Sequence, residues 1–297
     1  MRNKISGVLA AIATPFTSNG EPDIDMFIEH GEWLLDSGCD GLNVLGTTGE
    51  ANSQSSRSRA FLMRSAVEST LARGALMVGT GTPSVGETIE LTCLAADLGF
   101  DGALILPPYY YKGVADDGLF EYFSRVIRAV SDSDIGIYLY NFPQMTGLTF
   151  SMELVERLLE AFPQHMKGMK DSSGDLEYTN SMAATFGSAF DVFPGSEGPL
   201  PDAIEHGYAG CISASVNATV ALAANVWRQR DNVPADDVSE IRELRDGIAS
   251  MPMVAAVKTL VALRTGNDGW RRVLPPLTRL NEEQLPQIES IAERLGI

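Results

Sequence analysis

Three short motifs place reactive side chains directly after apolar segments of the chain. Lys170 ends one such segment, Tyr140 ends another, and the pair Thr47 and Thr48 follows a third. A lysine at the end of a buried strand loses water, which favours the neutral amine that attacks a carbonyl carbon. A tyrosine hydroxyl can transfer a proton, and threonine hydroxyls beside free backbone N–H groups can bind a carboxylate. These residue types predict covalent chemistry on a carbonyl compound, with Lys170 as the nucleophile.

Each motif also has a purely structural interpretation. Most lysines are solvated, as we expect for Lys167, and a buried tyrosine can serve packing alone. The segment 46–50, GTTGE, can be an ordinary turn between a strand and a helix. The segment 81–88, GTPSVGET, has the spacing of a phosphate-binding loop, but Glu87 occupies the lysine position and would repel phosphate. Ser84 and Glu87 instead predict a capped helix start.

The elements that must position these residues alternate regularly. Short apolar runs are followed by segments with helical periodicity, which is typical of parallel strands buried on both faces. The eight predicted strands are 8–13, 42–45, 76–79, 103–106, 135–140, 166–170, 191–193 and 211–214. Eight such units predict a closed (β/α)₈ TIM barrel. An open doubly wound sheet is the alternative, but it requires a glycine-rich turn after its first strand, and Ala13–Phe16 is not one.

Glycines mark the boundaries of the repeated units. A Gly-x-(Asp/Ala)-Gly element precedes a predicted strand at 38–41, 99–102 and 207–210, and its first glycine can end the preceding helix. We expect the catalytic barrel to span residues 1–231. Residues 232–297 are expected to form a helical extension packed on the barrel, with helices at 236–249, 253–264 and 282–295.

Composition limits the possible partners. The chain has 297 residues and a formal net charge of −17, which disfavours nucleic acids and anionic membrane surfaces. No apolar run reaches the length of a membrane span. Three cysteines without a C-x-x-C pair suit a reducing compartment, so we expect a cytoplasmic protein. The three histidines lack metal-ligand spacing, and no metal or organic cofactor is expected.

In combination the motifs resemble one family over essentially the whole chain. They are GTTGE (46–50), PPYY (107–110), YNFP (140–143), KDSSGD (170–175), Gly195 and GCISASVN (210–217). With these motifs the sequence resembles the dihydrodipicolinate synthase / N-acetylneuraminate lyase family of pyruvate-dependent class I aldolases.

The resemblance implies a role for each matched position. Lys170 would form a Schiff base with a 2-oxo acid such as pyruvate, and the loop carrying Gly46, Thr47 and Thr48 would hold its carboxylate. Tyr140 would pass protons through Thr47 to Tyr110 of a neighbouring subunit. Gly195 and the carbonyl of Ile212 would line the pocket. The resemblance also implies a homotetramer built as a dimer of dimers.

Two positions bear on the substrate. Lysine-pathway synthases of this family carry an arginine where this chain has Met145, and sialic acid lyases carry an acidic pair of which only Glu197 is present. The strings YNFPQMTG and GCISASVN look most like 2-keto-3-deoxygluconate aldolases, so we expect cleavage of a 2-keto-3-deoxy sugar acid to pyruvate and an aldehyde, with Met145 and Glu197 near the substrate. The alternatives are a 4-hydroxy-tetrahydrodipicolinate synthase, an N-acetylneuraminate lyase, a family dehydratase or deaminase, and, more remotely, a non-catalytic barrel that binds a 2-oxo acid.

Overall fold

The structure, a computed structural model, describes residues 5–297 and contains one eight-stranded parallel sheet in this range. Its strands are β1 (Gly7–Ala11), β2 (Gly41–Val44), β3 (Ala75–Gly79), β4 (Gly102–Ile105), β5 (Gly136–Asn141), β6 (Met166–Asp171), β7 (Asp191–Pro194) and β8 (Gly210–Ser213). Each coincides with a predicted strand to within two residues at either end. Most strand residues are buried, as expected for strands covered on both faces.

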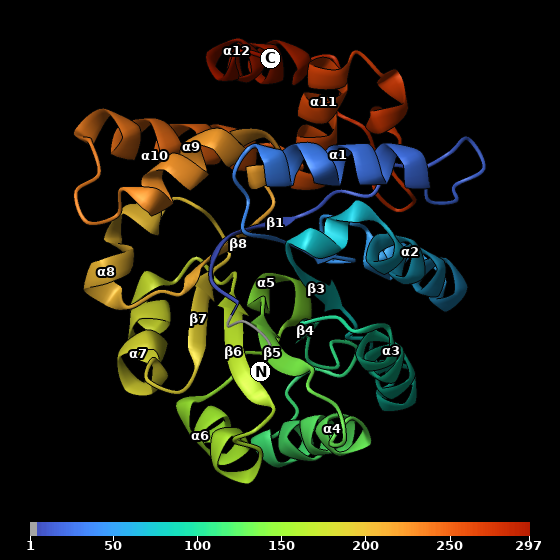
Figure 1. The fold of residues 1–297 in the computed structure, drawn as a ribbon, viewed down its shortest axis with the longest axis vertical. Helices are drawn as coiled ribbons and strands as arrows, with labels where there is room; N and C mark the ends of the chain where they lie inside the picture. Colours follow the sequence, from blue (N-terminus) through green and yellow to red (C-terminus); the bar gives the residue numbers. More distant parts are fainter. Residues whose placement is uncertain (1–4) are drawn as a thin grey trace.

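The sheet curves into a nearly closed barrel (Figure 1). From β1 to β7 each strand pairs with the next one along the chain, and β1 also pairs with β8 through the register Val8 with Cys211. β7 and β8 are connected just before β8, where the Ala209 N–H donates to the Val192 carbonyl oxygen at 3.0 Å, an ordinary backbone hydrogen-bond distance. The prediction of a TIM barrel with additional C-terminal helices is confirmed.

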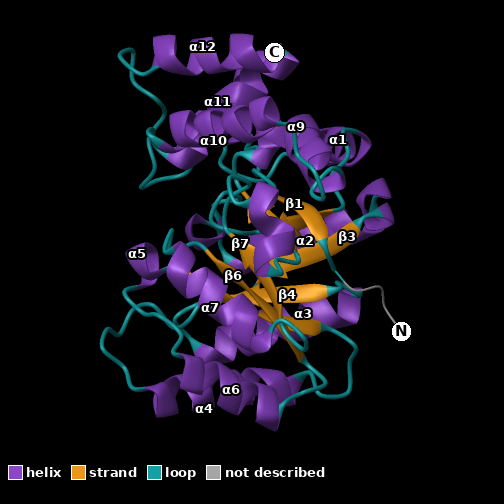
Figure 2. Ribbon diagram, turned by 90° about the vertical axis from the view of Figure 1, so that its left-hand side faces the viewer, coloured by secondary structure: helices purple, strands orange, loops and turns teal. Residues whose placement is uncertain are grey.

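Helices surround the barrel and continue beyond it (Figures 1 and 2). They are α1 (Ile24–Asp36), α2 (Ser56–Glu68), α3 (Val85–Leu98), α4 (Asp116–Ala129), α5 (Pro143–Thr146), α6 (Met152–Ala161), α7 (Leu176–Phe186), α8 (Ala203–His206), α9 (Val216–Arg228), α10 (Ala235–Ala249), α11 (Met253–Thr265) and α12 (Leu285–Leu295). Single 3₁₀ turns cover Ala51–Ser53, Thr70–Arg73, Leu200–Asp202 and Asp268–Arg271.

The glycines and the capped turn predicted at the element boundaries have a clear structural basis. Gly99 ends α3 with a φ of +86°, a left-handed conformation that glycine adopts without strain. Gly210 begins β8 so close to its neighbour that a Cβ atom would lie 1.9 Å from the Gly7 carbonyl oxygen. At the false phosphate loop, the Ser84 hydroxyl accepts the Glu87 N–H and α3 follows. The capped turn is therefore confirmed.

The C-terminal helices share a second apolar core with the barrel. Leu260, Trp270 and Ile288 are buried there together with Ala13, which follows β1. The helix predicted from residue 282 begins at Leu285. It follows a turn in which the backbone N–H groups of Asn281 and Gln284 each donate to the other residue's side-chain oxygen. Within residues 5–297, no one helix has the length and apolar character required to cross a bilayer. The helices α10 and α11 reach both only as a pair, which is bent by 113° between them.

Candidate active site

A cavity of about 800 Å³ opens at the carboxyl ends of the strands. Its walls come from the segments that follow β2, β5, β6 and β7, and from the C-terminal helices and the loop before α12. The C-terminal end of a TIM barrel is where active sites of this fold lie. Of the predicted site residues, Thr47, Thr48, Tyr140, Met145, Lys170 and Gly195 line this cavity.

Lys170 reaches the cavity from the end of β6. Its side chain is 5% exposed, and its Nζ lies 4.6 Å from the centroid of the Tyr140 ring. The two residues are register partners on β6 and β5, which holds them side by side. Lys167 lies an odd number of residues earlier on the strand, so it faces the opposite side of the sheet and does not line the cavity. The structure thus separates the two lysines as the sequence suggested.

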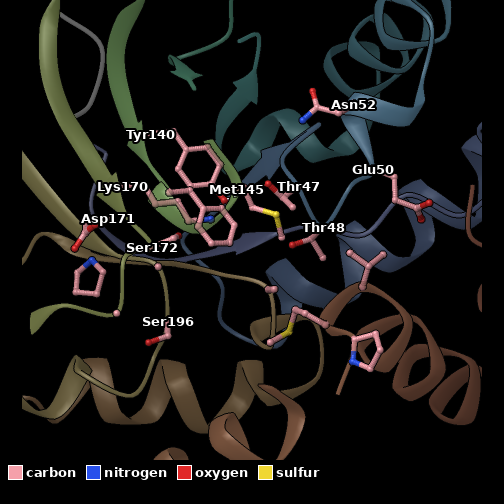
Figure 3. Close-up of a pocket in the computed structure, with 18 of the residues that line it drawn as sticks. Thr47, Thr48, Glu50, Asn52, Tyr140, Met145, Lys170, Asp171, Ser172 and Ser196 are labelled. Atoms are coloured by element: carbon pink, nitrogen blue, oxygen red, sulfur yellow. Dashed lines mark hydrogen bonds between the residues drawn. The ribbon is translucent and has the colours of Figure 1, made fainter. Parts of the chain in front are cut away.

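Tyr140 connects Lys170 to the segment Gly46–Gly49, which carries Thr47 and Thr48 and is called the threonine loop. Its hydroxyl lies 3.3 Å from the Thr47 hydroxyl, within hydrogen-bond distance. The Phe142 ring stacks on the Tyr140 ring with 5.8 Å between centroids, which fixes the orientation of the phenol. Figure 3 shows Lys170, Tyr140 and Thr47 converging on one side of the cavity. An amine, a phenol and a hydroxyl in this arrangement can attack a carbonyl and move a proton away from it.

The threonine loop is held in an unusual backbone conformation. Among residues 5–297, Leu45 and Glu50 are the non-glycine residues with positive φ, and both have a φ of 55°. They flank Gly46–Gly49, so the strain lies at either end of the segment that presents Thr47 and Thr48. Such strain persists only where surrounding contacts impose it.

Glu50 supplies one of these contacts. Its carboxylate binds Nζ of Lys258 on α11 at 2.5 Å and accepts the Leu274 N–H at 2.6 Å, and the side chains of both ionic partners are fully buried. Burial raises the pKa of Glu50 and lowers the pKa of Lys258 to about 8, while the attraction between the two charges opposes both shifts. The C-terminal extension is thereby tied to the threonine loop.

Asp171 follows Lys170 and also lines the cavity, but its carboxylate is occupied. It accepts hydrogen bonds from the Asn141 amide at 2.8 Å, from the Ser173 N–H and hydroxyl at 3.0 and 2.8 Å, and from the Thr179 hydroxyl at 2.5 Å. These bonds join the ends of β5 and β6 to α7. Asp171 therefore stabilises the strand end that carries Lys170.

Four predicted site residues lie outside the cavity lining: Gly46, Tyr110, Ile212 and Glu197. Gly46 directly precedes Thr47, Ile212 is buried in the apolar cluster that also contains Tyr140, and Tyr110 is 73% exposed. In Tyr110's place, Tyr109 of the same chain lines the cavity and donates to Asn52 at 3.1 Å. A role for Tyr110 in a neighbouring subunit stays a prediction.

Glu197 requires a correction. Its side chain is fully buried and its two carboxylate oxygens accept hydrogen bonds from Ser213 at 2.5 Å, Ser215 at 2.8 Å and Thr219 at 2.7 Å. A carboxylate satisfied by three hydroxyls inside the protein does not face a substrate. Its position therefore contradicts the expected contact with the substrate and supports a structural role between β7 and β8.

The sequence analysis missed Arg245, which lines the cavity from α10. No motif marks Arg245 in the sequence, because it lies in a helix whose periodicity indicates only packing against the barrel.

Within residues 5–297, no group of three or more histidine, cysteine, aspartate or glutamate side chains is arranged to hold a metal ion.

Comparison with known proteins supports a common origin over the whole chain. The model of the "Dihydrodipicolinate synthetase family" matches residues 4–295. An uncharacterized DapA-like lyase of Chloroflexus aurantiacus is 32% identical, over 97% of this chain and 96% of the relative. The crystal structure of dihydrodipicolinate synthase from Agrobacterium tumefaciens is 33% identical with a TM-score of 0.89, covering 98% and 99% of the two chains. YagE of Escherichia coli, solved with pyruvate, is 26% identical with a TM-score of 0.88, covering 98% of both chains.

Proposed function

Since this chain belongs to the dihydrodipicolinate synthetase family, whose members are class I pyruvate-dependent lyases, we propose that it cleaves a 2-keto-3-deoxy sugar acid to pyruvate and an aldehyde. The chain is a carbon–carbon lyase. The observation that carries the proposal is the placement of the Lys170 amine over the Tyr140 ring, with Thr47 bonded to the phenol, in one cavity. The pyruvate complex of YagE supports pyruvate as the shared half of the substrate.

The reaction follows from these positions. The Lys170 amine attacks the 2-oxo carbon and water leaves, which gives an iminium ion, while Thr47 and Thr48 bind the adjacent carboxylate. Tyr140 takes the proton of the C4 hydroxyl and passes its own toward Thr47. The C3–C4 bond then breaks, its electron pair moves into the iminium to form an enamine, and the aldehyde departs. Protonation of the enamine at C3 and addition of water release pyruvate and restore the amine.

A second candidate function is 4-hydroxy-tetrahydrodipicolinate synthesis, in which the same enamine adds to an aldehyde. The name of the Agrobacterium relative favours it. The residue at position 145 disfavours it, because Met145 lacks the guanidinium that binds the second carboxylate in family synthases. A thioether offers only an apolar surface, and Met145 is 62% exposed at the cavity wall.

The decisive experiment has two arms. Pyruvate with borohydride should add one reduced pyruvate to the peptide containing Lys170, and labelling that survives Lys170→Ala or maps to Lys167 contradicts the Schiff-base assignment. Turnover of 2-keto-3-deoxygluconate and condensation of pyruvate with aspartate semialdehyde are then compared in the native enzyme and in Met145→Arg. We expect kcat/KM to favour cleavage in the native enzyme and to shift by about 10- to 150-fold toward the semialdehyde in the variant. Efficient native condensation would select the second candidate.

A further inference from the structure

The cavity is lined by two basic side chains, Lys170 and Arg245, and within residues 5–297 neither forms a salt bridge. Its ionisable lining residues other than tyrosine are Glu50, Lys170, Asp171 and Arg245. The two acids are committed elsewhere, since Glu50 binds Lys258 and Asp171 accepts four hydrogen bonds from its own surroundings. In a chain with a net charge of −17, a guanidinium that lines a large cavity without an ion-pair partner is suited to bind an anionic group of a ligand.

Arg245 is positioned by contacts that leave its charge unpaired. Its Nη1 donates to the Ser215 hydroxyl at 3.2 Å and contacts the Met253 sulfur at 3.5 Å, and among residues 5–297 it forms no salt bridge. Ser215 in turn donates to the buried carboxylate of Glu197, so this chain of bonds orients the guanidinium without neutralising it directly. An arginine has five N–H donors in a planar fork, and most of those on Arg245 remain open to a ligand.

The surroundings strengthen any charge interaction at this site. Met253, Pro252 and Leu277 line the cavity beside the C-terminal helices and offer no polar side-chain group beyond a sulfur atom. Apolar walls reduce the local dielectric constant, and a bidentate pair between arginine and a carboxylate or phosphate is among the strongest hydrogen-bonded contacts in proteins.

From these observations we propose that Arg245 binds a second anionic group, a carboxylate or a phosphate, at the far end of the substrate. The inference rests on the proposed function, because Lys170 and the threonine loop hold the 2-oxo acid end. Arg245 lies on α10, whereas Met145 lies on α5. The substrate class narrows to a 2-keto-3-deoxy sugar acid whose distal end carries a carboxylate or a phosphate.

Both basic side chains lie at the walls of the same cavity of about 800 Å³. Lys170 lies at the end of β6, and Ser215, which accepts a hydrogen bond from Arg245, lies just after β8. One extended ligand in this cavity therefore has both residues at its walls.

The test uses matched ligands that all form the Schiff base. Unbranched 2-oxo acids of six to eight carbons are compared with the 2-oxo diacids of equal length and with a 2-oxo acid ending in a phosphate ester. The readout is the concentration that gives half-maximal borohydride trapping on Lys170, measured by intact mass. The proteins are the native enzyme, Arg245→Gln, Arg245→Lys and the control Arg242→Gln. Arg242 lies on the same helix, pairs with Asp202 at 2.8 Å and does not line the cavity.

We expect the native enzyme and Arg242→Gln to bind at least one doubly anionic ligand about 10- to 150-fold more tightly than its singly charged counterpart. Arg245→Gln should abolish that preference, while Arg245→Lys should keep part of it. Arg242→Gln should trap pyruvate as the native enzyme does. The terminal group preferred, carboxylate or phosphate, identifies the natural one. Equal binding of both ligand types by the native enzyme, or a preference that survives Arg245→Gln, overturns the inference.

Failure of the proposed function gives a different result. If the native enzyme traps no pyruvate, the Schiff base is wrong. Arg245 is then tested by calorimetric titration with unbranched dicarboxylates such as adipate, which bind without covalent chemistry. Binding that weakens in Arg245→Gln and persists in Arg242→Gln supports the anion site, and equal binding by all three proteins refutes it.

Discussion

The Glu50 carboxylate and the Lys258 ammonium lie 2.5 Å apart in the protein interior, although 208 residues separate them in the chain. Glu50 ends the threonine loop at a strained backbone position, and Lys258 lies in the middle of α11 with its Nζ also 4.4 Å from the centroid of the Phe16 ring. The ion pair therefore links the shape of the carboxylate-binding loop to the docking of the C-terminal helices.

Breaking this pair should cost stability. Lys258→Met leaves the buried carboxylate without its partner, and we expect the free energy of unfolding to fall by about 3–5 kcal/mol in urea titrations. The double variant Glu50→Gln/Lys258→Met removes both charges and should recover a large part of the loss. Arg242→Gln, which breaks the partly exposed pair with Asp202, should change stability by less than about 1 kcal/mol. A single variant as stable as this control would refute the role of the ion pair.

Tyr140→Phe should lower turnover by about 10²- to 10⁴-fold, because it removes the hydroxyl that transfers protons and leaves the ring in place. The Lys170 Schiff base with pyruvate should still be trapped by borohydride, since the amine and the carboxylate site are intact. Circular dichroism and urea unfolding check that the variant is folded. Near-native turnover would assign Tyr140 to packing.

The predicted homotetramer can be tested through Tyr110. Tyr110 and Tyr111 are 73% and 69% exposed and pack edge to face with ring centroids 5.2 Å apart, which provides a matched pair. We expect Tyr110→Phe to lower kcat by at least about 10-fold and Tyr111→Phe to change it little, if only Tyr110 enters a neighbouring active site. Mixed oligomers of Tyr110→Phe and Lys170→Ala subunits should then regain activity. A fully active monomer in light scattering excludes a shared site.

Acid should destabilise the protein partly through His30. This side chain is fully buried, its Nδ1 faces the Arg264 guanidinium at 3.1 Å and its Nε2 faces Asn217 Oδ1 at 2.9 Å, which suits the neutral ring. Burial lowers the pKa of His30 from 6.5 to about 3. Between these pH values the unfolded chain binds a proton that the folded chain does not, so stability falls as pH falls, by about 1.4 kcal/mol per pH unit from this group.

The measurement compares urea unfolding at pH 7 and pH 5 in the native protein and in His30→Gln. The loss on acidification should be smaller in His30→Gln by about 2 kcal/mol, since that variant lacks the group that titrates differently in the two states. His206→Gln, at the end of α8, is the control and should behave like the native protein. An equal loss in all three proteins contradicts the assignment.

Local sequence patterns were sufficient to predict the barrel architecture and the two reactive residues at the centre of the site. Alternating apolar and helical segments predicted all eight strands, because a strand buried on both faces has a composition that is visible in a short window. Lys170 and Tyr140 could be singled out for the same reason: each closes such a segment, and the strand ends of a barrel meet at one face.

Contacts between distant segments were not predictable in this way. The Glu50–Lys258 pair, the enclosure of Glu197 by Ser213, Ser215 and Thr219, and the position of Arg245 depend on how α10, α11 and the loops pack on the barrel. Periodicity indicates which face of an element is buried, but it does not indicate which polar group will be opposite. A lysine inside an apolar helix and a glutamate inside a loop acquire their partners only when burial makes an unpaired charge too costly to leave.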